Sequence, residues 1–112
     1  MAITPKEEIN ELVQYRSKKL ERHFGYSVPP YPDYLFNVLG YMSMDRERME
    51  KAKMFFELAI EYYPKSANTY DSMADYYERN DDYTNALKFV AKAFEISNDD
   101  YHKERIEGLK KK

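Results

Sequence analysis

The chain has 112 residues, a formal net charge of −2 and no cysteine, so it can form one compact domain and cannot form disulfides or thiolate metal sites. Few glycines and prolines among many Ala, Leu, Met, Glu, Lys and Arg residues favour helices, and twelve tyrosines are a marked excess. No apolar run is long enough for a membrane span or for the core of a signal peptide, so we expect no membrane insertion.

Charged residues are unevenly distributed along the chain. Residues 65–100 carry four basic and eight acidic side chains, whereas residues 101–112 carry five basic and two acidic ones. Nucleic-acid binding needs a basic face that neutralises several phosphates, and no segment supplies one. The C-terminal lysines are explained more simply by solvation or by the dipole of a final helix. We therefore predict no nucleic-acid partner.

The first predicted element is a helix within residues 1–25. Thr4 suits the N-cap, Pro5 the first helical position, and Glu7 the glutamate position of a capping box. Gly25 is expected to end the helix, because glycine tolerates the left-handed conformation found there. The apolar stripe of this helix is Ile9, Leu12, Val13, Leu20 and Phe24.

A connector and a pair of helices follow. Residues 26–32 contain three prolines in four positions, which predicts an extended segment. Helices are expected over about 33–45, with Asp33 as N-cap, and over about 47–62, before Pro64. The inward side chains predicted for the latter helix are Ala52, Phe55, Phe56, Ala59 and Ile60.

A second pair of helices is predicted next. Ser66 is expected to cap a helix that runs to about Arg79, and a helix near 82–96 follows a polar turn. The inward residues of this pair are Tyr70, Met73, Ala74, Tyr77, Tyr83, Ala86, Leu87, Val90, Ala93 and Phe94. Asn98, Asp99 and Asp100 then begin a short polar helix. Its predicted docking face is Tyr101, Ile106 and Leu109.

The two pairs match each other when the sequence is shifted by 34 positions. The aligned pairs keep size as well as hydrophobicity: Phe36 with Tyr70, Leu39 with Met73, Gly40 with Ala74, Ala52 with Ala86, Phe55 with Phe89, Ala59 with Ala93 and Ile60 with Phe94. Such a period is typical of helix–turn–helix repeats, whose units bury their apolar faces on one another. We predict one all-α domain over 1–112, with repeats at 33–66 and 67–98 and a capping helix at 99–112.

This pattern resembles the tetratricopeptide repeat. The first unit supplies the motif residues Phe36, Leu39, Gly40, Ala52, Phe56, Ala59 and Pro64, and the second supplies Tyr70, Met73, Ala74, Tyr77, Ala86, Val90, Ala93 and Asn98. Ser43 departs from the expected tyrosine. A third unit is absent, because Glu104 and Glu107 stand where bulky residues are needed. Two repeats are fewer than such stacks usually need, so the terminal helices are expected to complete the core.

A narrower likeness covers most of the chain, including the proline connector. Three runs, at 24–30, 37–41 and 63–74, resemble a bacterial tail domain that follows the catalytic domain of esterase-type α/β-hydrolases and of some β-lactamase-like serine hydrolases. This resemblance implies that the chain is the C-terminal tail of such a hydrolase, or a stand-alone relative of that tail. The catalytic serine would then lie outside this chain.

The resemblance places a binding groove on the first helix of each unit. Its predicted lining is Tyr34, Asn37, Tyr41, Met44, Asn68, Asp71, Asp75 and Glu78, with His102 and Arg105 from the capping helix. Asp71 and Asp75 are four residues apart on one helix, so their charges project together. They would repel a terminal carboxylate, which favours a basic or hydroxyl-rich segment, or a surface of the parent hydrolase. A merely solvated acidic face is the open alternative.

We predict no catalysis by this chain itself, no metal and no cofactor. A nucleophile elbow needs a serine between glycines after a strand, and no glycine here lies in that relation to a serine. Asp71 and Ser72 are better read as helix residues than as part of a triad. His23 and His102 lie in different terminal helices without clustered carboxylates.

These observations predict a non-catalytic docking module, whose partner is a protein, a peptide or the parent catalytic domain. The alternative is a structural or dimerisation extension of the parent hydrolase with an unoccupied groove, for which a homodimer would be expected. Tyrosines that the small core cannot bury would take part in either kind of contact, because tyrosine is favoured at interfaces. The sequence assigns no compartment.

Overall fold

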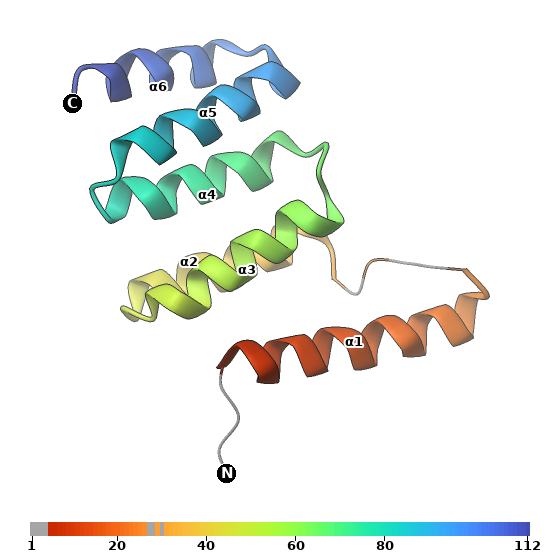
Figure 1. Ribbon diagram of the computed structural model, residues 1–112. Helices are drawn as coiled ribbons and strands as arrows, with labels where there is room; N and C mark the ends of the chain where they lie inside the picture. The colour runs from red at the N-terminus through yellow and green to blue at the C-terminus, as the bar shows by residue number, and fades with distance from the viewer. Residues whose placement is uncertain (1–4, 27–28, 30) are drawn as a thin grey trace.

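The structure, a computed structural model, describes residues 5–26, 29 and 31–112, and over this part it is all-helical (Figure 1). The helices are α1 (Pro5–Phe24), α2 (Asp33–Asp45), α3 (Met49–Tyr62), α4 (Ala67–Arg79), α5 (Tyr83–Ser97) and α6 (Asp100–Lys110). The predicted all-α fold class is confirmed. The N-cap predicted at Thr4 lies outside the described residues.

The helices form two antiparallel hairpins that stack side by side. α2 packs on α3 and α4 packs on α5, and the hairpins meet chiefly through α3 and α4. Figure 1 shows α6 on α5 at one end of the stack and α1 beside α3 at the other. This is the predicted helix–turn–helix repeat with an additional helix at each end. The molecule measures 48 × 35 × 17 Å along its principal axes, so it is a thin slab with a large surface for its size.

Small residues bring the paired helices close together, as the repeat pattern predicted. Five buried alanines, all without exposed surface, lie at the helix contacts: Ala52, Ala59, Ala74, Ala86 and Ala93. Gly40 lies against the ring of Phe56, which is itself fully enclosed. Protein interiors are packed too densely to absorb added methyl groups without strain, so these positions set the spacing of each hairpin.

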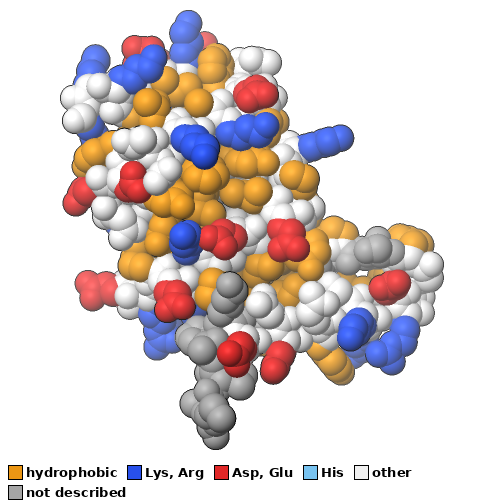
Figure 2. Space-filling model, viewed as in Figure 1, with side chains coloured by type: hydrophobic (Ala, Val, Ile, Leu, Met, Phe, Trp, Pro, Cys, Tyr) orange, Lys and Arg blue, Asp and Glu red, His pale blue; other side chains and the backbone are white. Residues whose placement is uncertain are grey.

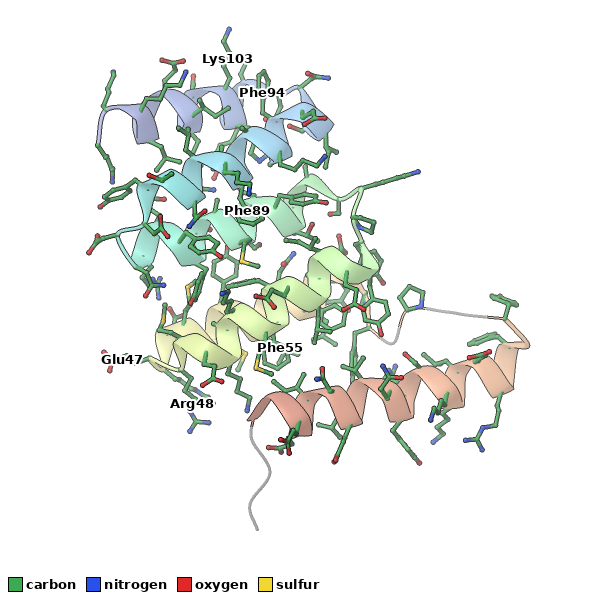
Figure 3. The ribbon with its side chains drawn as sticks, viewed as in Figure 1. Glu47, Arg48, Phe55, Phe89, Phe94 and Lys103 are labelled. Atoms are coloured by element: carbon green, nitrogen blue, oxygen red, sulfur yellow. The ribbon has the colours of Figure 1, made fainter. Side chains whose placement is uncertain are left out.

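The core runs through the stack as three clusters. The cluster at the N-terminal end joins Ile9 and Val13 of α1 to Phe36, Leu58 and Ala59. A middle cluster lies between the two hairpins, and a third lies between α4, α5 and α6. Phe89 of α5, labelled in Figure 3, packs against both the middle and the third cluster. Both terminal helices therefore contribute to the core, as expected for a stack of two repeats.

One predicted helix cap is wrong, and a second is right in position but lacks the expected hydrogen bond. The N-cap of α2 is Pro32, and Asp33 is the first helical residue; its carboxylate accepts from the Tyr34 amide at 2.8 Å and from the Ser66 hydroxyl at 3.0 Å. Ser66 does occupy the N-cap position of α4, but its hydroxyl makes no capping bond. A long-range bond between these two residues thus replaces both local caps and fastens the start of α4 to the start of α2.

Parts of the predicted apolar faces are also wrong. In α1, Leu12 is 57 % exposed and Phe24 is 47 % exposed, because the helix contacts the stack near its N-terminal half and extends beyond it (Figure 1). In α6, Tyr101 is exposed and the neighbouring His102 is buried in its place. The predicted end of α1 is confirmed, since Gly25 has a φ of +78°.

Candidate protein-interaction surface

The face formed by α2, α4 and α6 carries a set of polar contacts between equivalent positions of neighbouring units. Four of these contacts join residues 34 positions apart: Tyr41 with Asp75, Asp45 with Arg79, Asp71 with Arg105, and Glu78 with Lys112. Because the first helices of successive units run in the same direction, equivalent side chains face each other across the gap. We call this surface the α2–α4–α6 face.

Arg105 is the centre of these contacts. Its guanidinium donates to the carboxylates of Asp71 and Asp75, and to a carboxylate oxygen of Glu78 at 3.2 Å. The Arg105 side chain is 12 % exposed and that of Asp71 is 15 % exposed. A planar guanidinium has enough donors to satisfy several carboxylates at once. The predicted joint projection of Asp71 and Asp75 is therefore seen, but both point at a cation of the same chain.

The ionisation of this cluster follows from burial and from its charges. Burial raises the pKa of Asp71, the Arg105 charge opposes that rise, and the neighbouring Asp75 charge adds to it. Burial alone would lower the pKa of Arg105, but Asp75 and Asp71 outweigh it, so the pKa is raised. Arg105 therefore stays charged and fixes α6 to α4 through paired side chains.

His102 closes one end of the cluster. Its Nε2 lies 3.4 Å from an Asp71 oxygen, and its Nδ1 lies 2.7 Å from Asp99 and 2.9 Å from the Ser97 hydroxyl. Asp99 also accepts from the His102 amide at 3.0 Å, so it caps α6 and orients the imidazole. The buried His102 is thus part of the junction between α5, α6 and α4.

The structure divides the predicted groove residues into three groups. Tyr34, at 63 % exposure, and Asn68 are open to solvent. Tyr41, Asp71, Asp75, Glu78 and Arg105 are partly buried and bonded to one another. The assignment of Asn37 and Met44 to an open groove is wrong, since they are 4 % and 3 % exposed.

Asn37 is unusual because neither atom of its buried amide has a hydrogen-bond partner. It lies in the first turns of α2, immediately after the enclosed ring of Phe36. An unsatisfied buried polar group costs about 1–3 kcal/mol. The first unit therefore contains a buried amide, that of Asn37, which makes no hydrogen bond that would stabilise the fold.

A hollow lies on the α2–α4–α6 face between the two repeat units. It is lined by Tyr41, Asp75, Glu78 and Arg79 and has a volume of about 370 Å³. The Tyr41 hydroxyl donates to Asp75, and Arg79 pairs with Asp45 at 3.0 Å, so most of the lining is held in place. Burial and the Asp75 contact raise the pKa of Tyr41, which keeps its hydroxyl protonated.

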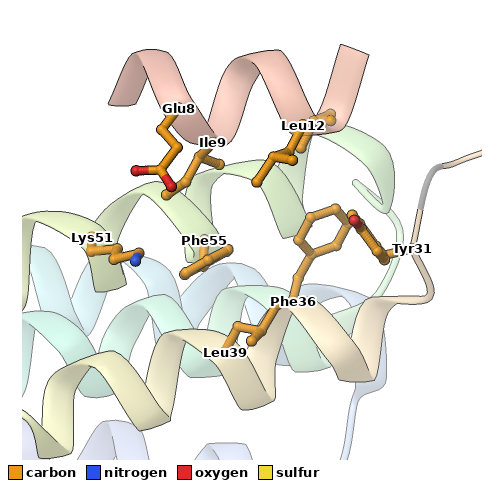
Figure 4. Close-up of a pocket in the computed structure, with 9 residues that line it drawn as sticks. Glu8, Ile9, Leu12, Tyr31, Phe36, Leu39, Lys51 and Phe55 are labelled. Carbon is orange, nitrogen blue, oxygen red and sulfur yellow. The ribbon is translucent and has the colours of Figure 1, made fainter. Parts of the chain in front are cut away.

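Sequence reasoning missed a second hollow, between α1 and the first hairpin. It has a volume of about 160 Å³, and Figure 4 shows Leu12 and Ile9 of α1 above Phe36, Leu39 and Phe55. The apolar stripe assigned to α1 included Leu12, but the stripe gave no indication that this helix would leave space beneath it. An adjoining hollow of about 130 Å³ continues past Met42 to the α2–α3 turn.

The described residues also bear on the other kinds of site considered in the sequence. None of their helices is long and apolar enough to cross a membrane. No group of three His, Asp or Glu side chains among them could hold a metal ion. Ser72, considered as a nucleophile, is 1 % exposed within α4. Figure 2 shows charges of both signs mixed across the visible face, around hydrophobic side chains over the stacked helices.

Paired antiparallel helices, small residues at their contacts and polar pairs at a fixed spacing define a helical-repeat protein. A family model of the tetratricopeptide repeat matches residues 34–66 and 67–100. The chain therefore belongs to the tetratricopeptide repeat family, whose repeats are generally protein–protein interaction modules. The two matched segments cover the α2–α3 hairpin from its second residue onward and the whole α4–α5 hairpin. A search of the curated proteins found no match.

Proposed function

We propose that this domain is a non-catalytic docking module that binds a protein or peptide on its α2–α4–α6 face. The observation that supports this most is the hollow between the two repeat units, whose lining side chains are held by contacts between the repeats. Binding to a prearranged surface avoids the entropy cost of ordering it. Exposed Tyr34 and Asn68 lie on the first turns of α2 and α4, where a bound segment would meet them.

The charge of this face favours a partner segment with hydroxyl or cationic side chains. Asp71, Asp75 and Glu78 outnumber the cations bound to them, Arg105 and Lys112. The cluster therefore keeps a net negative charge. This charge is smaller than the sequence suggested, because the two cations offset most of the three carboxylates. Like charges across an interface are unfavourable, so this net charge disfavours a segment ending in a free carboxylate.

A peptide array tests this proposal. Peptides enriched in Ser, Thr, Lys and Arg should bind the intact domain better than acidic ones, and less tightly at high salt. Replacing both Tyr34 and Asn68 by Ala should weaken the binding of selected peptides about tenfold, whereas Tyr15→Ala on exposed α1 should not. Enrichment of acidic peptides, or an unchanged Kd for the Tyr34 and Asn68 double variant, would contradict the proposal.

We also propose, from the sequence resemblance, that the module serves an esterase-type hydrolase as a C-terminal tail. In that arrangement the parent catalytic domain is a further candidate for the bound surface. The reading frame that contains this chain is the test. A hydrolase domain directly preceding Met1 in the same frame would support the tail, and an unrelated domain there would refute it.

The alternative function is a structural or dimerisation extension of that hydrolase. Val38 and Met42 favour it, because both lie on α2 with nearly half of their surface exposed. Sedimentation of the domain over a range of concentrations distinguishes the two functions. A dimer that dissociates on Val38→Glu with Met42→Glu would support the alternative, whereas a monomer that binds array peptides would favour docking.

A further inference from the structure

We infer that the hollow beneath α1 is a second docking site, which takes an acidic amphipathic helix of a protein partner. Two adjoining hollows, which share Leu39, Lys51 and Phe55, form one groove between α1 and the α2–α3 hairpin. We call it the α1–α3 groove. It has no residue in common with the hollow of the α2–α4–α6 face, so it goes beyond the function proposed above.

The floor of the groove is apolar and incompletely covered. Ile9, Val13 and Phe36 are buried, while Leu39 and Phe55 beside them are only partly covered. Figure 3 shows Phe55 projecting from α3 towards α1. At the edges, Leu12 is 57 % exposed and Met42 is 45 % exposed. A contiguous apolar patch of this kind is typical of an interaction site.

The end of the groove away from the body of α1 is cationic. The hollow there is lined by Arg46, Arg48 and Lys51 together with apolar residues and Ser43, and by no acidic side chain. Among the ion pairs formed within the described part of the chain, none involves these three cations. Arg48 extends from the α2–α3 turn on the side where α1 lies (Figure 3). Charge complementarity therefore calls for carboxylates on the partner.

Helix α1 itself shows what kind of element fits this surface. It places Ile9 and Val13 on the hairpin and carries Glu8 above Lys51, as Figure 4 shows. The end of the groove that no described residue covers continues the same surface past the first turn of α1 and offers the same combination of apolar floor and cations. A helix with one apolar stripe and flanking carboxylates would thus extend the packing that α1 begins.

A designed peptide tests the inference on the complete chain. The probe is an 18-residue helix with Leu at i, i+3, i+4 and i+7, Glu and Ala elsewhere, and a fluorescent label, and its Kd is measured by fluorescence anisotropy. Arg46→Glu with Arg48→Glu should raise that Kd at least tenfold. Lys88→Glu with Lys103→Glu, an equal charge change at exposed positions of α5 and α6, should leave it within twofold.

Reversing the charges of the peptide as well controls for misfolding of the variant, because only a folded variant can gain affinity for the reversed peptide. The same peptide with Lys in place of Glu should bind the Arg46 and Arg48 variant more tightly than it binds the natural chain. The original designed peptide, with Glu, should bind the Tyr34 and Asn68 double variant with an unchanged Kd, which separates this site from the α2–α4–α6 face. No binding, equal binding of a peptide with scattered Leu, or no effect of the charge reversal would overturn the inference. So would a dimer that the reversal dissociates, since a second copy would then occupy the groove.

Discussion

Gly40 of α2 lies directly against the ring of Phe56 of α3. A Cβ built on Gly40 would come 2.3 Å from Cε1 of that ring. Phe56 is completely enclosed by the protein, so a shift of its ring would have to displace the core residues around it. Glycine is needed here for space, because the backbone of α2 at this position is ordinary helix. The contact fixes how closely the helices of the first hairpin approach.

We expect Gly40→Ala to lower the free energy of unfolding by about 1–3 kcal/mol, the range found for overpacked cores. Gly108 provides the matched control, because a Cβ there meets nothing within 4 Å. Gly108→Ala should instead raise stability by about 0.5–1 kcal/mol through its helix propensity. Urea unfolding followed by circular dichroism measures both. A Gly40→Ala protein as stable as the natural chain would show that the hairpin is loosely packed.

Removing Arg105 should strongly destabilise the junction of α6 with α4. Arg105→Ala leaves Asp71 and Asp75 close together and partly buried without their cation, and we expect a loss of about 2–4 kcal/mol, near the lower end for buried pairs. Arg79→Ala removes the exposed pair with Asp45 and should cost about 0–1 kcal/mol.

Hydrogen exchange locates the effect of the Arg105 change. Amides of α6 should exchange faster in Arg105→Ala while those of α2 keep their protection, because Arg105 holds the C-terminal helix in place. Similar losses of stability in the Arg105 and Arg79 variants would mean that the carboxylate cluster contributes no more than a surface ion pair.

Replacing Asn37 by Leu should stabilise the protein. The amide has no partner for either of its polar atoms, and a side chain of similar shape removes that cost, so we expect a gain of about 1–2 kcal/mol. Asn68→Leu, at an exposed position, should change stability by no more than about 0.5 kcal/mol. Thermal or urea unfolding measures both. A loss of stability in Asn37→Leu would reveal that the amide has a bonding role.

Tyr41 should make the protein less stable at alkaline pH. Burial, and then the hydrogen bond to Asp75, raise the pKa of its phenol above the ordinary value. Its stabilising contribution is complete below about pH 10, where an unfolded tyrosine ionises, and is lost as the pH rises towards the folded value. In that interval the unfolded chain releases a proton that the folded chain keeps.

Urea unfolding at pH 8 and pH 11 isolates this contribution when the natural chain is compared with Tyr41→Phe. Other tyrosines with raised pKa values, such as Tyr63 and Tyr76, are common to both proteins and drop out of the comparison. The natural chain should lose more stability over this pH interval than the variant. Equal losses would show that Tyr41 ionises as freely in the folded protein as in the unfolded one.

Much of the fold could be predicted because both repeat units must satisfy the same packing requirements at equivalent positions. The alignment of Gly40 with Ala74 and of Ala52 with Ala86 is a requirement of close helix packing, and it leaves a residue-size pattern that can be read without coordinates. One helix end marked by backbone conformation was equally clear, since Gly25 takes the left-handed conformation after α1 as predicted. Asn98 takes the same conformation after α5, although it was expected to begin the last helix.

The site was less predictable because its decisive contacts join distant residues. Asp33 and Ser66 both have the local chemistry of N-caps, yet they bond to each other once α4 comes beside α2. Asp71 and Asp75 look like a free acidic surface until the last helix brings Arg105 to them. The exposure of Leu12 depends on the angle at which α1 meets α3, which helical periodicity does not encode.

The contacts between residues 34 positions apart also restrict which unit can follow which in the stack. If residues 67–100 were duplicated in tandem, Asp71 would face a second Asp71 and Asp75 a second Asp75, because each position meets its own equivalent in the next unit. The second unit therefore packs well after the first unit, which supplies Tyr41, and before α6, which supplies Arg105. A second copy of the same acidic unit beside it would be repelled. The carboxylates that hold this short stack together thereby oppose its growth into a longer array of identical units.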